Sequence, residues 1–357
     1  MKLLQELSEA RGPAGWEDEV RAIFRESLKG IGEGCQVDRL GSIYCPLTSD
    51  GDKPRIMLCA HMDEVGFIVN EIMDNGFLRF LPLGGWWGHV LPGQRVWVRT
   101  ISAQWRIGVI GAVPPHLQGN EAKSVLEPHE MFLDIGGKDR DDVEKNLGIR
   151  TGAVVVPATR FEWLRDRSLC LGKAFDDRAG LALVIETLQE LVGESLQVNV
   201  IGAGSVQEEV GCRGAGVLAN HIKPDLAIIL ECAPADDIPD LPRGPSQGKL
   251  GAGVQIRLLD PTTIMSRGLV ELALRLAEEQ GIPHQIAVRK SGGTDAKSIH
   301  LAHIGVPSLV LGVPARYIHS HVAVMDASDY QAARKLVLAL LRHLSRETCS
   351  TILYEKD

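Results

Sequence analysis

Two adjacent glutamates, Glu208 and Glu209, follow an apolar run over 198–203 that predicts a buried strand. Burying neighbouring charges is costly unless a metal ion or a proton-transfer role compensates for it. Taken alone, such a pair is most often solvated in a loop. Other acidic and imidazole side chains also follow apolar runs in this chain, which favours a shared site: His61, Asp63, Asp176, Glu231 and His319.

His61 and Asp63 follow the apolar segment 56–60. Residues two apart in an extended segment point to the same face. A histidine that binds metal commonly donates its other ring N–H to a carboxylate, and Asp63 has the right spacing to accept it from His61. The alternative for this triplet alone is an exposed, polar strand end.

Asp176 and Asp177 stand where a helix over 177–192 is expected to begin. An aspartate here could serve only as an N-cap. Alternatively, Asp177 caps the helix and Asp176 bridges two cations. Arg178 is expected to pair with carboxylates. Histidine and carboxylate ligands without cysteine suit zinc, cobalt or manganese, with coordination positions left open to water. Two ions that share a carboxylate can hold a hydroxide and polarise a carbonyl group.

The sequence pattern changes between residues 67 and 157, where short predicted strands are separated by frequent glycine and proline residues. This pattern predicts a small β-barrel or sandwich inserted into an α/β domain made of residues 1–66 and 158–357. The larger part alternates helices and strands, as in a sheet covered by helices, where ligands bind at the strand carboxyl ends. Strands are expected at 37–40, 42–46, 56–60, 77–81, 95–99, 106–110, 153–157, 198–203, 226–230, 254–258, 285–288 and 308–311; helices at 139–147, 177–192, 215–220, 264–279 and 327–344.

Composition narrows the function classes. The 357 residues exceed what one core usually supports, and the net charge is −8 with no block of lysine or arginine, so a nucleic-acid surface is not indicated. No apolar run is long enough to span a membrane. The seven cysteines are scattered, without a Cys-x-x-Cys pair, which argues against a disulfide framework or a thiolate zinc site. The segment 1–11 is expected to form an amphipathic helix with Glu6 and Glu9 within its apolar pattern, which does not resemble a signal peptide, so a cytoplasmic location is expected.

Five motifs together resemble the cocatalytic di-metal aminopeptidases of the TET type, a family also described as glutamyl aminopeptidase or endoglucanase-like, and most of all its FrvX-like branch. They are His61-Met-Asp63-Glu-Val-Gly, Lys173-Ala-Phe-Asp176-Asp-Arg, Gln207-Glu208-Glu209-Val-Gly, Gly292-Gly-Thr-Asp295-Ala and Arg316-Tyr-Ile-His319-Ser. The resemblance covers nearly the whole chain. It implies a phosphorylase/hydrolase-like α/β domain with a PDZ-like β-barrel insertion over 67–157 that mediates assembly.

The resemblance also implies a role for each matching position. His61 and Glu231 would hold one metal ion, Glu209 and His319 the other, and Asp176 would bridge them. Glu208 would be the general base, and Asp63 would orient His61. The loop Gly293-Thr294-Asp295 would line the substrate site. This set of ligands exceeds one closed tetrahedral site, which predicts two divalent ions per subunit, with zinc favoured and cobalt or manganese as alternatives. Glu231 stands where family members often have Asp.

The leading hypothesis is therefore a metal-dependent aminopeptidase that uses a hydroxide held by two metal ions to remove N-terminal residues from short peptides. An acyl-amino-acid or C-terminal amide hydrolase is a second possibility. A glycosidase using Glu208 and Glu209 is less favoured, because sequence neighbours in a strand point to opposite sides. An inactive scaffold would not need the intact ligand set.

Two further expectations concern substrate and assembly. The surplus of carboxylates favours the α-ammonium group of a free N-terminus, and the loop 233–245 with the strand from Val254 onward is expected to shape the pocket. The resemblance implies a homo-oligomer built from dimers, up to a dodecamer. The apolar run Trp86, Trp87, Val90 and Leu91 is expected to form either a contact surface or part of the inserted domain's core.

Overall fold

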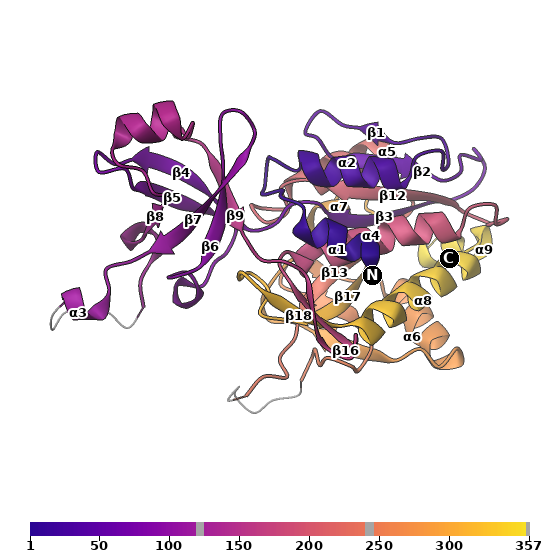
Figure 1. Ribbon diagram of the computed structural model, residues 1–357. Coiled ribbons are helices and arrows are strands. Elements are labelled where there is room, and N and C mark those ends of the chain that lie inside the picture. Colours follow the sequence, from indigo (N-terminus) through magenta and orange to yellow (C-terminus); the bar gives the residue numbers. More distant parts are fainter. Residues whose placement is uncertain (119–124, 240–245, 355–357) are drawn as a thin grey trace.

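The computed structural model describes residues 1–118, 125–239 and 246–354 (Figure 1). Its larger part is built on a 12-stranded sheet. The central strands are parallel and run in the order β12 (Asn199–Ser205), β3 (Arg55–His61), β13 (Leu226–Pro234) and β17 (Ser308–Arg316). These strands are apolar along almost their whole length because helices cover both faces of the sheet.

Two helices show how both faces are covered. Helix α4 (Phe175–Glu190) leads from β11 (Leu169–Gly172) to β12, and α5 (Arg213–Ile222) leads from β12 to β13. These connections cross the sheet in opposite directions. Because crossovers between parallel strands are right-handed, α4 and α5 lie on opposite faces. Helices α1 (Lys2–Glu9) and α8 (Ala327–His343) pack on α4, and α7 (Ala296–Ile299) packs on α5.

The remaining elements extend the sheet and its helical layers. Strands β1 (Gln36–Val37) and β2 (Ile43–Pro46) add one edge, and β18 (Ala323–Asp326), β11 and β10 (Glu162–Arg165) add the other. Strand β14 (Val254–Asp260) pairs with β17, β15 (Thr263–Ile264) and β16 (His284–Val288). The helices not yet named are α2 (Asp18–Ser27), α6 (Arg267–Glu279) and α9 (Arg346–Ile352).

A closed barrel forms a second body beside the sheet (Figure 1). Its strands follow the order β4 (Gly66–Ile72), β5 (Leu78–Leu83), β8 (Phe132–Asp134), β7 (Trp105–Gly111), β6 (Arg95–Arg99) and β9 (Val154–Pro157). The barrel has its own apolar core, which includes Phe67, Phe80 and Leu133. Short helical turns lie at η1 (Gly88–Val90), α3 (Pro115–Gln118), η3 (Pro128–Glu130) and η4 (Asp142–Asn146).

The predicted fold class, a helix-covered mixed sheet with a β-barrel, is confirmed. Several details differ. Glu231 lies inside β13, because that strand continues to Pro234. The helix expected at 139–147 is a single π-helical turn over Asp142–Asn146, and the strand expected at 37–40 ends at Val37. Strands β4, β8, β10, β11, β15 and β18 were not among the expected segments.

The apolar run near Trp86 belongs mainly to the barrel. Leu91 is fully buried in the barrel core, and the indole of Trp86 stacks on Phe67 with ring centroids 4.6 Å apart. Of these four residues only Trp87 is largely exposed, with 45% of the residue's surface accessible. A contact surface is thus the wrong interpretation for Trp86 and Leu91, because the barrel needs both to fill its interior.

Side-chain contacts fix the barrel to the larger part. The guanidinium of Arg11 lies 5.4 Å from the ring centroid of Trp97 and 5.3 Å from that of Trp105, a cation–π arrangement on two barrel strands. The indole N–H of Trp105 also donates to Glu19 of α2, at 3.0 Å. These side-chain contacts, together with the two chain segments that join the barrel to the larger part, therefore hold the barrel in a defined position.

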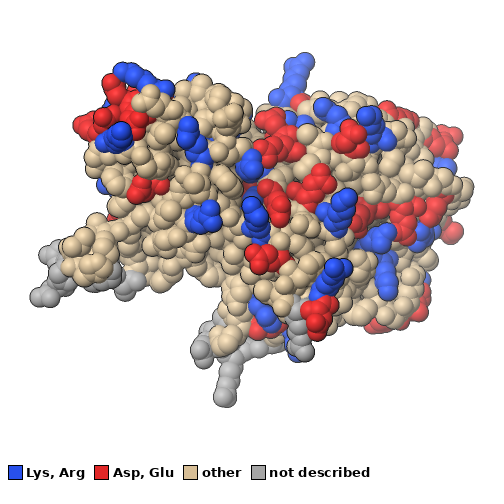
Figure 2. All heavy atoms as spheres, in the orientation of Figure 1, with Lys and Arg blue, Asp and Glu red and all other residues tan. Residues whose placement is uncertain are grey.

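The surface in Figure 2 mixes both signs of charge. Lysine and arginine side chains are scattered among aspartates and glutamates on this face, with no continuous basic patch. Among the residues that the structure describes, no helix has the length and apolar character needed to cross a membrane.

A buried ion cluster ties the start of the chain to α4. Lys173 Nζ donates to both carboxylate oxygens of Glu64 at 2.7 Å and to the carbonyl of Ala10 at 2.7 Å. Arg178 lies 3.4 Å from Glu64 and donates to carbonyls of the first helix and the loop after it. This agrees with the structural role expected for Arg178.

We expect Glu64→Gln to lower the free energy of unfolding by about 3–5 kcal/mol, because it leaves two buried cations without their anion. Urea unfolding followed by circular dichroism measures the change. Glu71→Gln is the matched control, since Glu71 is exposed on β4. Equal stability of the two variants would show that the buried cluster is energetically neutral.

Candidate metal centre

The predicted site residues come together at one edge of the sheet although they are distant in sequence. His61 ends β3, Asp176 opens α4, and Glu208 and Glu209 follow β12. Glu231 projects from β13, and His319 follows β17. Parallel neighbours place their carboxyl ends together, so β12, β3, β13 and β17 deliver these side chains to the same place.

The carboxylate of Asp176 lies between the two histidines. Its Oδ1 is 3.2 Å from His61 Nε2, and its Oδ2 is 3.3 Å from His319 Nε2. His319 Nε2 is also 3.2 Å from Glu209 Oε2, and His61 Nε2 is 3.7 Å from Glu231 Oε1. Two donors on one tetrahedral zinc ion lie about 3.3–3.5 Å apart when each bond is about 2.0–2.2 Å. The spacing of this donor set therefore suits two neighbouring ions with Asp176 between them.

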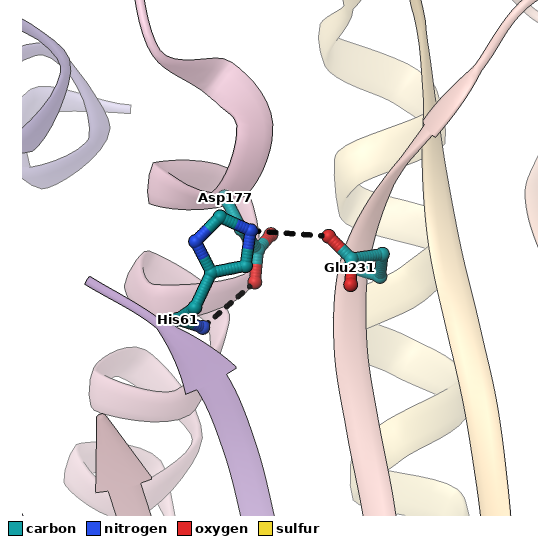
Figure 3. Close-up of side chains that lie close together, drawn as sticks. All are labelled: His61, Asp177 and Glu231. Atoms are coloured by element: carbon teal, nitrogen blue, oxygen red, sulfur yellow. Dashed lines mark hydrogen bonds and ion pairs between the residues drawn. The ribbon is translucent and has the colours of Figure 1, made fainter. Parts of the chain in front are cut away.

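Asp177 lies close to His61 and Glu231 but is already engaged (Figure 3). Its carboxylate accepts hydrogen bonds from the backbone N–H groups of His61, at 3.2 Å, and Gly180, at 3.0 Å. A Cβ atom on Gly180 would lie 2.5 Å from this carboxylate, so only glycine allows the contact. Asp177 thus caps α4, as its position predicts, and holds the end of β3 against that helix.

The hydrogen bond at Nδ1 of His61 sets its tautomer. Nδ1 lies 3.0 Å from the backbone carbonyl of Asp63, which can only accept, so Nδ1 carries a proton and, in the neutral ring that a metal ion would bind, the lone pair is on Nε2, which faces the centre. The Asp63 carboxylate is farther from Nδ1, at 3.5 Å. It accepts the backbone N–H groups of Glu208 at 2.9 Å and Glu209 at 3.1 Å. Asp63 therefore positions both the imidazole and the glutamate pair.

Glu208 lies next to the proposed metal ligands, but its carboxylate has different neighbours. Its Oε2 is 3.9 Å from His61 Nε2, and its Oε1 accepts a hydrogen bond from the thiol of Cys212 at 3.0 Å. Cys212 and Asp295 form a close group with Glu208. Sequence reasoning did not single out Cys212; only its place four residues after Glu208, in the same turn, connects them.

The loop expected to line the substrate site lies behind Glu208. Thr294 and Asp295 are almost fully buried, and Ser205 donates a hydrogen bond to the Asp295 carboxylate. Gly293 is exposed. Residues 240–245 of the other expected pocket segment, 233–245, lie outside the described residues. His321 is buried against Trp86, with ring centroids 5.2 Å apart.

The electrostatics of the site favour cations. Burial raises the pKa of Glu209 and of Glu231 well above the usual value, because nearby carboxylates and the apolar surroundings oppose a second negative charge. Burial also raises the pKa of Glu208. Burial opposes a charge on His61 too, but the carboxylates of Asp176 and Asp63 outweigh it and raise the pKa of that imidazole.

An unsatisfied carboxylate oxygen of Glu209 gives an independent reason to expect a metal ion at this site. Oε1 of Glu209 is buried and has no hydrogen-bond partner among the described residues. A buried, unsatisfied carboxylate oxygen costs about 1–3 kcal/mol or more, and a metal ion would satisfy it. His319 also adopts a left-handed backbone conformation, with φ +57°, a strain typical of functional sites. The donor set, the spacing and the unsatisfied oxygen all fit divalent cations.

Comparison with known proteins gives the same picture. The family described as M42 glutamyl aminopeptidase matches residues 41–336. The chain is 37% identical over 349 residues to the putative aminopeptidase FrvX of Escherichia coli (strain K12), which covers 97% of this chain and 96% of the relative.

Solved structures of similar proteins share the fold of this chain. The TET aminopeptidase of the marine sediment archaeon Thaumarchaeota archaeon SCGC AB-539-E09 superposes with a TM-score of 0.94 at 38% identity, covering 99% of this chain and 98% of that one. The TET1 peptidase of Pyrococcus horikoshii, which assembles into a tetrahedron or a large octahedral shell, gives a TM-score of 0.85 at 33% identity, covering 96% and 99%. By its family match, its identities and its fold, this chain belongs to the M42 aminopeptidase family of enzymes.

Proposed function

We propose that this protein is a metal-dependent aminopeptidase that removes N-terminal residues from short peptides with two divalent ions per subunit. The observation that carries the proposal is the Asp176 carboxylate, whose two oxygens face the two histidines at 3.2 and 3.3 Å. His61 and Glu231 would hold one ion, Glu209 and His319 the other. Zinc suits this nitrogen and oxygen donor set, and cobalt or manganese are alternatives.

When bound, such ions lower the pKa of the attacking water and polarise the scissile carbonyl. The residues of the chain supply the rest. Glu208 accepts the proton from water and later passes it to the leaving amine; its raised pKa makes it a better proton acceptor. The Cys212 thiol holds Oε1 of Glu208, and Asp63 holds its backbone, so the other oxygen, Oε2, faces His61 and the centre.

The surplus of negative charge favours a substrate with a free α-ammonium group. Six carboxylates lie at this site, and they exceed the four positive charges that two divalent ions would bring: Asp63, Asp176, Asp177, Glu208, Glu209 and Glu231. The two arginines within the ligand motifs are engaged elsewhere, Arg178 with Glu64 and Arg316 with Asp237, so they do not form a pair that binds a C-terminal carboxylate. Gly293 of the loop after β16 is the exposed residue of its triplet and is proposed to contact the substrate, with Thr294 and Asp295 supporting it from behind.

N-acetylation of a short peptide is expected to reduce kcat/KM by tenfold or more. Acetylation removes the positive charge, and losing a hydrogen bond to a charged group costs about 1.5–3 kcal/mol. Mass spectrometry compares cleavage of one peptide in free, N-acetylated and C-amidated forms. Equal cleavage of the acetylated peptide would favour an acyl hydrolase, and loss of cleavage on C-amidation alone would favour a carboxypeptidase.

Assembly is also part of the proposal. The Pyrococcus horikoshii peptidase forms closed shells, and we infer a homo-oligomer built from dimers, up to a dodecamer, for this chain. We propose residues 67–157 as the inserted domain that contributes to assembly and residues 1–66 with 158–357 as the peptidase domain. A monomer in multi-angle light scattering would refute assembly. Buried thiols such as Cys59 and Cys232 suit a reducing compartment, so a cytoplasmic location belongs to the same proposal.

A further inference from the structure

The barrel segment that follows β5 lies directly against the proposed metal centre. A Cβ atom on Gly84 would lie 3.4 Å from Oε2 of Glu209, and a Cβ atom on Gly85 would lie 3.3 Å from Nδ1 of His319. Glu209 and His319 are 3.2 Å apart and belong to the same half of the centre. The barrel backbone at Gly84 and Gly85 therefore leaves room for little more than a methyl group beside the side chains proposed to hold one of the two ions.

A side chain is unfavourable at these two positions for different reasons. Gly84 has φ +87°, in the left-handed region, and a Cβ there would lie 2.7 Å from Cγ1 of Val65. Gly85 has no such backbone restriction, and the nearest atom to an added Cβ is the imidazole of His319. A side chain added at Gly85 would therefore press on His319 without straining the backbone. Substitution of Gly85 is for this reason the more specific test.

Trp86, the residue after Gly85, holds this segment in place. Its indole N–H donates to the carbonyl of Gly66 at 3.0 Å, and its ring stacks on Phe67 in the barrel core. The same indole lies 5.2 Å from the ring of His321, two residues after His319. His321 is only 3% exposed, and neither ring nitrogen has a hydrogen-bond partner among the described residues. Its contact with Trp86 is therefore packing, which holds the loop that carries His319.

The barrel as a whole cannot move away from this contact without losing others. Arg11 lies against Trp97 and Trp105, and Trp105 donates to Glu19. The bridge between Pro13 and Glu64 and the tight approach of Gly66 to Pro13 lie where the chain enters the barrel. The position of Gly84 and Gly85 beside the centre is thus fixed by contacts on several barrel strands.

We propose that Gly84, Gly85 and Trp86 are positioning residues for the half of the metal centre formed by Glu209 and His319. This inference rests on the proposed function. It makes the barrel a structural part of the active site, in addition to its proposed role in assembly. A peptidase domain without residues 67–157 would then lose the support of one ion even where its own ligands remain.

The test is the metal content of full-length Gly85→Val, after equilibration at a fixed free zinc concentration. We expect a fall from two zinc ions per subunit to one, because the valine side chain displaces His319 but does not reach His61 or Glu231. Gly85→Ala should keep the second ion with weaker affinity. Gly51→Val is the matched control, since Gly51 has no atom within 4 Å of an added Cβ and no left-handed conformation.

A second set of variants leaves both glycines in place. Trp86→Ala removes the packing on His321 and should also weaken the second ion, whereas Trp86→Phe should restore it and Trp87→Ala should have no effect on zinc content. Melting temperature and oligomeric mass are measured in parallel, so that a folding defect is recognised. Two ions at wild-type affinity in folded Gly85→Val or in Trp86→Ala would overturn the inference. A wild-type protein that binds none of zinc, cobalt and manganese would refute the proposed function itself.

Discussion

Glu208→Gln is expected to lower kcat by about 10²–10⁴-fold, the usual contribution of a general base, while both metal-binding positions stay intact. The amide has nearly the shape of the carboxylate but cannot accept the proton from water. Glu208 groups with Cys212 and Asp295 and not with the two sets that contain His61, and its Oε1 accepts a hydrogen bond from Cys212, so the substitution leaves the proposed ligands in place.

Activity on an aminoacyl reporter, zinc content and melting temperature are measured on the same preparation. Glu26→Gln serves as the control, because Glu26 is a solvent-exposed glutamate on α2. Turnover within a few-fold of wild type would exclude Glu208 as the base. A loss of zinc in the variant would instead make Glu208 a ligand.

Removal of the metal ions is expected to abolish peptidase activity. The most specific test is substitution of Asp176, the carboxylate proposed to bridge the two ions. Asp176→Ala should lose both ions, because the two carboxylate oxygens serve both halves of the centre. His319→Ala should lose one ion, since His319 faces only Glu209 and Asp176.

Zinc content after dialysis against a chelator and re-addition of zinc distinguishes these cases. Asp74→Ala is the control, because the side chain of Asp74 is 96% exposed on the barrel. Full activity in metal-free wild-type protein would end the metal hypothesis. One ion remaining in Asp176→Ala would show that this carboxylate does not bridge.

The sequence predicted the position of His61 well because a continuous apolar run leads up to it and β3 ends there. The same reasoning failed for Glu231. The strand continues through Cys232, Ala233 and Pro234, paired with β17, and a charged residue inside a strand resembles a strand end when only polarity is read. Tertiary pairing, which one sequence does not display, decided where β13 stops.

The contacts between distant segments were beyond sequence reasoning. Nothing in the segment Gly84-Gly85 reveals that Glu209 and His319 lie beside it, because a glycine pair is equally typical of an ordinary turn. Asp63 was expected to act on His61; its hydrogen bonds to the backbone of Glu208 and Glu209 depend on how β3 and β12 pair. Residue types predicted the chemistry of the site, and the sheet pairing determined its geometry.

The wide separation of the site residues along the chain has a consequence for biosynthesis. His61 and His319 both face Asp176, so the centre cannot close until β17 and the loop after it have been made and have joined the sheet. Contacts between residues this far apart form late, because the entropy of closing long loops must be overcome first. An unfinished chain on the ribosome therefore has no peptidase activity, and nascent proteins nearby are not exposed to a partly made enzyme.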